Sequence, residues 1–116
     1  APGMNLWAGQ AKGVSVQLDS GALLPLPLGV RVPDGPVTLG IRPQHLRPEV
    51  GGPIRAEVRL IEALGPESVV HADMGAGGGL LAVLPGQPDL GRGAVIELGY
   101  EPQFVHVFGS DGQRLA

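Results

Sequence analysis

Residues 37–46, VTLGIRPQHL, decide how this sequence folds. Apolar side chains alternate with threonine and glycine from Val37 to Ile41, the period of two that predicts a strand with one buried face. Pro43 ends the strand, because proline has no N–H to donate, and it can begin a single helical turn. Such a turn would fold Leu46 back onto the core and leave Arg42 and His45 at the rim of the sheet.

The same alternation predicts further strands on both sides of this segment. In the first of them Met4, Leu6 and Ala8 are expected on the core face, with Trp7 on the opposite face. Leu39, Ile41, Val58, Leu60 and Ile96 are expected in the core. Together with residues 37–41, the predicted strands make eight or nine short elements, joined by at most one or two helical turns: residues 4–12, 14–18, 22–26, 54–60, 68–74, 80–84, 94–100 and 104–108.

The composition favours one all-β domain that covers residues 1–116. Apolar residues make up 43% of the chain, and its 20 glycines and 12 prolines mark frequent turns. A small OB-like barrel with appended strands is an economical way to hide so many strand edges. No cysteine is present, which suits a reducing compartment. The longest apolar tract, residues 21–30, is too short to span a bilayer and is broken by two prolines.

No catalytic, cofactor-binding or metal-binding residues are predicted. The glycine-rich tip at residues 75–79 is not followed by Lys-Ser/Thr, so it predicts a turn and not a phosphate-binding loop. His71 and Asp73 share a strand face, which would allow a base–orienter pair or two metal ligands, but a solvated strand face is the simpler interpretation. His106 lies between Phe104 and Phe108 on one face, which predicts a packed histidine.

Four segments, which together span nearly the whole chain, carry a family resemblance: PGMNL at residues 2–6, GIRPQHL at 40–46, EALGPE at 62–67 with His71 after it, and PQFVHVF at 102–108. In this order they resemble the C-terminal regulatory (TOBE/OB-type) domain of ATPase subunits in sugar-type ABC importers, the maltose and glycerol-phosphate class. Residues 40–46 are similar to the hallmark of that family, with Gln44 where the family usually has glutamate.

The resemblance implies a regulatory and dimer-bracing domain without catalysis of its own. ATP and Mg²⁺ would be bound only by a preceding nucleotide-binding domain. The implied partners are that ATPase domain, the regulatory domain of a second subunit, the transporter's membrane subunits and a regulatory protein. The implied location is cytoplasmic, at the inner face of the cell membrane. The interface expected from off-core and rim positions comprises Trp7, Arg42, Pro43, Gln44 and His45.

Two alternatives belong to other functional classes. A domain that senses a small ligand, an oxyanion or a sugar, would show a surface pocket lined by Arg42, His45 or Arg47. An OB-type nucleic-acid binder would need a basic groove, whereas the formal net charge of this chain is −3.

Overall fold

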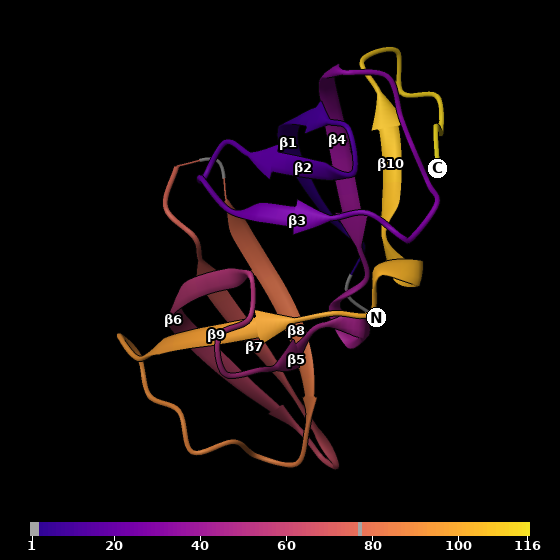
Figure 1. Cartoon of the computed structure of the whole chain (residues 1–116). Helices are drawn as coiled ribbons and strands as arrows, with labels where there is room; N and C mark the ends of the chain where they lie inside the picture. Colours follow the sequence, from indigo (N-terminus) through magenta and orange to yellow (C-terminus); the bar gives the residue numbers. More distant parts are fainter. Residues whose placement is uncertain (1–2, 77) are drawn as a thin grey trace.

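The computed structural model describes residues 3–76 and 78–116; residues 1, 2 and 77, the last within the expected glycine-rich turn, lie outside this description. The described chain forms ten strands in two five-stranded antiparallel sheets (Figure 1). The first sheet has the order β10-β4-β1-β2-β3 and the second the order β5-β9-β6-β7-β8. The bounds are β1 Asn5–Lys12, β2 Ser15–Leu18, β3 Leu23–Pro25, β4 Gly35–Ile41, β5 Arg47–Pro48, β6 Ile54–Leu64, β7 Glu67–Asp73, β8 Gly79–Pro85, β9 Val95–Gly99 and β10 His106–Gly109, with 3₁₀ turns η1 at Pro43–His45 and η2 at Pro102–Phe104.

The all-β class is confirmed, and the strand count is ten where eight or nine were expected. The strand that the sequence pattern missed is β5, only two residues long, which pairs with β9 through Arg47 and Gly99. A strand of two residues is too short to show an alternation of apolar and polar side chains, and a proline such as Pro48 usually indicates the end of a strand. No helix among residues 3–76 and 78–116 is long and apolar enough to cross a membrane.

The segment at residues 37–46 behaves as its sequence predicts. β4 pairs with β1 on one side and β10 on the other, so it lies inside the first sheet. Pro43 begins η1, and the His45 N–H donates to the Arg42 carbonyl at 2.9 Å. Leu46 is buried. The turn thus carries the chain from the first sheet to the second.

Side chains of β1 join the two sheets along the edge of β8. The Asn5 side chain is buried and donates to the Ile41 and Leu81 carbonyls at 3.1 and 2.9 Å, while it accepts the Leu81 N–H at 2.8 Å. The Trp7 Nε1–H donates to the Gly79 carbonyl at 3.0 Å. These bonds satisfy main-chain groups of β8 that no sixth strand covers, which is why buried polar atoms are tolerated here.

The prediction of which face of β1 is buried is wrong. Trp7 is 2% exposed and Leu6 is 59% exposed, so the buried face carries the odd-numbered residues. An inward Asn5 looks unfavourable in sequence, yet its hydrogen bonds to β4 and β8 pay its desolvation cost. Gly9 also faces inward, where a Cβ atom would lie 2.6 Å from the Gln17 carbonyl oxygen. Asn5 and Gly9 thus interrupt the apolar residues of the buried face, so the sequence pattern did not identify that face.

The expected core is confirmed at Leu39, Ile41, Val58 and Ile96 and is wrong at Leu60. β6 and β7 change register between Val58 and Leu60, which marks a β-bulge. One extra residue reverses the alternation, so Leu60 turns outward and is 53% exposed.

Tyr100, the one tyrosine of the sequence, follows β9 and closes the core beside β3. It is buried, and its hydroxyl donates to the Pro25 carbonyl at 3.0 Å. Burial raises the pKa of the Tyr100 phenol above its ordinary value. Because the folded state binds this proton more tightly than the unfolded state, the stabilisation is complete below about pH 10 and decreases above it.

We therefore expect no phenolate absorbance from the native protein through about pH 11, with phenolate appearing only as the chain unfolds. Ultraviolet absorbance and circular dichroism, followed together through an alkaline titration, test this expectation. Tyr100→Phe is the control, because its stability should decrease less above about pH 10. Titration near the ordinary tyrosine value with native dichroism would contradict the buried placement.

Candidate functional site

The expected interface residues at the end of β4 divide into exposed and buried positions. Arg42 and Gln44 are exposed and His45 is half-buried, so these three lie at the rim as expected. Pro43 is fully buried under the turn that it begins. Pro43 and Trp7 are therefore too deeply buried to be contact residues, contrary to the prediction. Pro43 supports the turn, and Trp7 is part of the core.

The His45 ring has a fixed orientation. It stacks on Phe104 of η2 with ring centroids 3.9 Å apart and an interplanar angle of 17°. Its Nδ1 atom is buried and has no hydrogen-bond partner among the described residues.

Two further basic residues lie on β10 and on the segment that follows it. His106 of β10 lies opposite Gly40 of β4, two residues before Arg42. Arg114 bridges back to Phe108, and its Nε–H donates to the Ala116 main-chain oxygen at 3.2 Å. We call Arg42, His45, His106 and Arg114 the basic rim. Partial burial and then the charges of Arg114, Arg42 and His45, in that order, lower the pKa of His106 below its usual value.

An apolar hollow lies on the outer face of the same sheet. It has a volume of about 360 Å³ and is lined by Leu6, Thr38 and Phe108 together with the turn at residues 109–112. Gly40 lies beside this hollow, because a Cβ atom there would lie 3.3 Å from both Leu6 Cδ2 and Phe108 Cε2 and closer still to Met4 Sδ. Leu6 was predicted in the core from the alternation of β1, and the structure places it on this surface instead.

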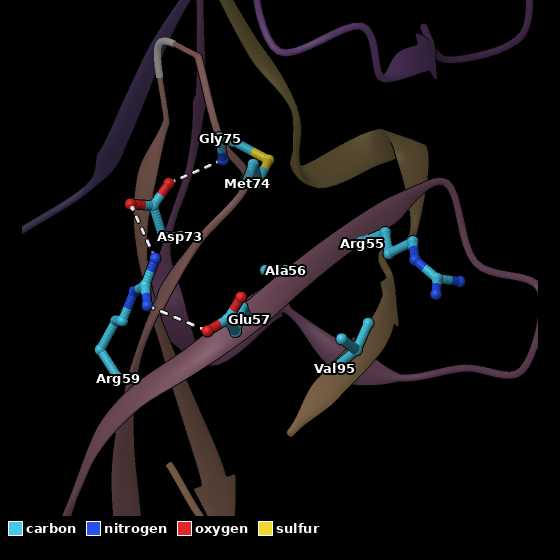
Figure 2. Close-up of a pocket in the computed structure, with 8 residues that line it drawn as sticks. All are labelled: Arg55, Ala56, Glu57, Arg59, Asp73, Met74, Gly75 and Val95. Atoms are coloured by element: carbon cyan, nitrogen blue, oxygen red, sulfur yellow. Dashed lines mark hydrogen bonds and ion pairs between the residues drawn. The ribbon is translucent and has the colours of Figure 1, made fainter. Parts of the chain in front are cut away.

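A second hollow of about 330 Å³ on the other sheet is lined by charges that neutralise one another (Figure 2). Arg59 reaches Glu57 at 3.0 Å and Asp73 at 3.8 Å, and Asp73 also accepts the Gly75 N–H at 2.7 Å. Figure 2 shows Arg55 extending away from this network, towards Glu97 at 3.9 Å. The Arg59–Asp73 pair joins β6 to β7 and the Arg55–Glu97 pair joins β6 to β9, so each charged side chain that lines this hollow has a partner of opposite charge.

His71 and Asp73, the two residues that could have formed a dyad, contact different partners. His71 Nε2 pairs with Glu62, whereas Asp73 pairs with Arg59, so each has its own partner. Among residues 3–76 and 78–116, no group of three or more histidine, aspartate or glutamate residues is placed to hold a metal ion. His45 stacks on Phe104, two residues before His106, a proximity that sequence spacing alone did not predict.

Comparisons with known proteins place this geometry in a family. The chain is 35% identical over 118 residues to the sn-glycerol-3-phosphate import ATP-binding protein UgpC of Ruegeria pomeroyi, with 100% of this chain and 33% of that protein aligned. It is also 35% identical over 116 residues to UgpC of Jannaschia sp., covering 99% of this chain and 32% of the relative. The chain thus spans about a third of the length of the curated relatives that it matches.

A solved structure supports the fold independently. The cytoplasmic molybdate-binding protein ModG superposes with a TM-score of 0.72 at 15% sequence identity, over 89% of this chain and 94% of that chain. At this identity the likeness concerns the fold alone. The family model of the TOBE domain matches residues 39–108, which include the end of β4, all of β5 to β9, both 3₁₀ turns and most of β10. With more than half of its residues matched by that model, this chain belongs to the TOBE domain family.

Proposed function

We propose that this chain is the regulatory and dimer-bracing domain of the ATP-binding subunit of an ABC importer. The observation that carries the proposal is the alignment: two ATP-binding import proteins match this chain over nearly all of its length, while it accounts for about a third of theirs. Their names point to sn-glycerol-3-phosphate, within the broader class of sugars and related solutes. The proposed location is the cytoplasmic face of the membrane.

We further propose that ATP and Mg²⁺ bind outside this domain, which has no turnover of its own. The sequence has no Gly-x-x-x-x-Gly-Lys-Ser/Thr loop. The side chains with catalytic promise have separate partners: His71 is hydrogen-bonded to Glu62, and Asp73 forms an ion pair with Arg59. Regulation and assembly would then act through the surface of the domain.

The proposed contact surface is the first sheet, from Arg42, Gln44 and His45 across Gly40 to the apolar hollow at Leu6. Arginine and exposed aromatic or apolar side chains are the types that carry most interface energy. The proposed partners are the equivalent domain of a second subunit, the ATPase domain of the same subunit and a regulatory protein, with the membrane subunits contacted through the whole protein.

The alternative function, sensing of a small ligand in a surface pocket, has less support than the contact surface. The five described hollows are lined by residues other than Arg42, His45 and Arg47. A sugar would need such a pocket, since its recognition depends on several enclosed polar contacts. The formal net charge of −3 disfavours the nucleic-acid alternative, which would need a basic groove.

Replacing Leu6 by serine together with Arg42 by alanine tests the contact surface in an ATP-binding subunit that carries this domain. We expect the dimer to weaken by about tenfold or more, since loss of two central contacts commonly costs over 1 kcal/mol. Sedimentation equilibrium with and without ATP measures the change, and a regulator titration measures the response.

The matched control replaces Leu64 by serine and Arg92 by alanine, which removes the same side-chain types from exposed positions elsewhere. Both double variants should retain the native circular dichroism. Unchanged assembly and unchanged regulation in the first variant would refute this surface, and equal weakening in both variants would show that its location is irrelevant.

A further inference from the structure

The β6–β7 hairpin leaves part of one strand edge without a partner. β6 is 11 residues long and pairs with β7 along residues 57–64. On its other side it pairs with β9 only along residues 54–57. This second ladder ends at Val58, whose N–H donates to the Ala94 carbonyl and whose carbonyl accepts the Gly93 N–H, both at 2.8 Å. Beyond Val58, no described strand lies on this side of β6.

The alternation of hydrogen bonds in the second sheet identifies the main-chain groups on this open edge. The N–H and C=O of Leu81 bond to the Asn5 side chain, on the side of β8 that faces away from β7. Bonded and non-bonded pairs alternate in an antiparallel ladder, so the even-numbered residues of β7 bond to β8 and its odd-numbered residues to β6. Ile61 and Ala63 lie opposite even-numbered residues of β7, and their main-chain groups therefore point away from it.

The chain itself blocks much of its other strand edges. Side chains of Asn5 and Trp7 bond to the first part of β8. Residues 113–116 run along β10 and form main-chain hydrogen bonds of 2.7, 2.8 and 2.9 Å with it. β3 and β5 are very short and each carries a proline, which has no N–H to donate. Residues 60–64, by contrast, contain neither proline nor lysine, the residues that usually protect a strand edge.

The side chains of the same segment are suited to contact another strand. The β-bulge turns Leu60, Glu62 and Leu64 to the outer face of the sheet, and the two leucines are 53% and 57% exposed. Residues 60–67 carry two glutamates and no lysine or arginine. The basic side chain beside them, His71, is hydrogen-bonded to Glu62. This edge thus combines open main-chain groups, exposed leucines and negative charge.

We propose that residues 60–64 bind an extended segment of a basic partner protein, which adds an antiparallel strand to the open edge of β6. Main-chain hydrogen bonds supply affinity in strand addition, and alternate side chains supply specificity. The segment carries an apolar side chain, a lysine or arginine, and a second apolar side chain at alternate positions, opposite Leu64, Glu62 and Leu60. Opposite charges that face each other across two strands stabilise the pair.

A second copy of this chain fits the edge less well. Antiparallel pairing through all the open groups of both edges would place Ile61 of one copy opposite Ala63 of the other. The two Glu62 side chains would then lie directly opposite each other, and like charges in that position are destabilising. The basic rim does not provide the occupant either, because its residues come from separate elements and not from one extended segment.

Hydrogen exchange of the 116-residue chain, followed by ¹H–¹⁵N NMR, tests whether the edge is open. The N–H groups of Ile61 and Ala63 should exchange at least about tenfold faster than that of Glu62, which is bonded to β7. Equal protection of the three would show that the edge is covered and would overturn the proposal.

A peptide with blocked ends and the sequence Thr-Val-Thr-Lys-Thr-Val-Thr is the probe for the partner. It should shift the amide signals of Ile61 and Ala63 saturably, with a dissociation constant of about 1 mM or tighter, and should slow their exchange. The same peptide with glutamate in place of lysine should bind about fivefold or more weakly. Equal binding of the two peptides would overturn the basic partner, and a lysine peptide without saturable shifts would overturn strand addition.

Charge reversal provides a second test of the same pairing. Glu62→Lys should reverse the preference, so that the glutamate peptide binds more tightly than the lysine peptide. Asp19→Lys, the same change at an exposed turn of the first sheet, should retain the original preference. An identical response of the two variants would mean that net charge, and not Glu62, determines binding, which contradicts the proposed register.

Ala63→Pro tests the main-chain contact, because it removes a donor from the open edge and leaves the bonds to β7 in place. It should weaken binding of the lysine peptide by about fivefold or more, whereas Ala63→Thr, which keeps the N–H, should not. The NMR spectrum of each variant shows whether it is folded. Unchanged binding by a folded Ala63→Pro variant would refute edge pairing.

Two further outcomes are separated by the same spectra. Signals of Ile61 and Ala63 that broaden with protein concentration alone would identify a second copy as the occupant and overturn the basic partner. The measurements use the chain alone and an edge of the second sheet, so their failure would leave the proposed contact surface on the first sheet unaffected.

Discussion

Replacing Trp7 by alanine should destabilise the domain by about 3–5 kcal/mol, the usual cost of removing a large buried aromatic side chain. Trp7 is 2% exposed and packs in the core from the middle of β1. Its Nε1–H donates to the Gly79 carbonyl at 3.0 Å, so the variant also leaves a main-chain acceptor of β8 without this partner. The substitution removes packing and one link between the two sheets at the same time.

Urea unfolding followed by circular dichroism measures this loss, because the chain contains no other tryptophan to report it by fluorescence. Leu6→Ala is the matched control, since Leu6 is the next residue and is 59% exposed; its cost should stay below about 1 kcal/mol. Trp7→Phe should fall between the two. A Leu6 variant less stable than the Trp7 variant would restore the face of β1 that the sequence pattern predicted.

Leu39→Ala should cost about 2–4 kcal/mol, because it opens a cavity in the middle of β4 between β1 and β10. Leu39 lies opposite Trp7 on one neighbouring strand and opposite Val107 on the other, and all three are buried. Neighbours held in two ladders have little freedom to close a cavity, so the cost should lie well above that of a surface change.

Leu60→Ala is the control for this second prediction and also tests the β-bulge. The same substitution at Leu60, 53% exposed beyond the register shift, should cost less than about 1 kcal/mol. The comparison uses the free energy of unfolding from the same urea titration. Equal losses at residues 39 and 60 would mean that the alternation of β6 continues without a bulge.

The sequence predicted only some of the residues that lie at the surface of the domain. Arg42, Gln44 and His45 are at the rim because Pro43 ends β4 and turns the chain, an effect of proline that acts on its immediate neighbours. The positions of Trp7 and Leu6 did not follow, because a strand that alternates Asn, Trp, Gly and Ala against Leu, Ala, Gln and Lys offers two plausible inward faces. In the structure the face with Asn5 and Trp7 is buried, because Asn5 forms hydrogen bonds with β4 and β8 there.

By itself, the sequence determined the all-β class, the strand and turn at residues 37–46 and most of the core, because period, proline and glycine act over a few residues. Only the tertiary structure decided the face of β1, the bulge that exposes Leu60 and the place of His106 beside β4. Each of these depends on which distant strand lies alongside: β8 supplies partners for Asn5 and Trp7, β7 sets the register of β6, and β10 brings His106 to β4. Pairing between distant strands is a property of the whole chain, and no local pattern encodes it.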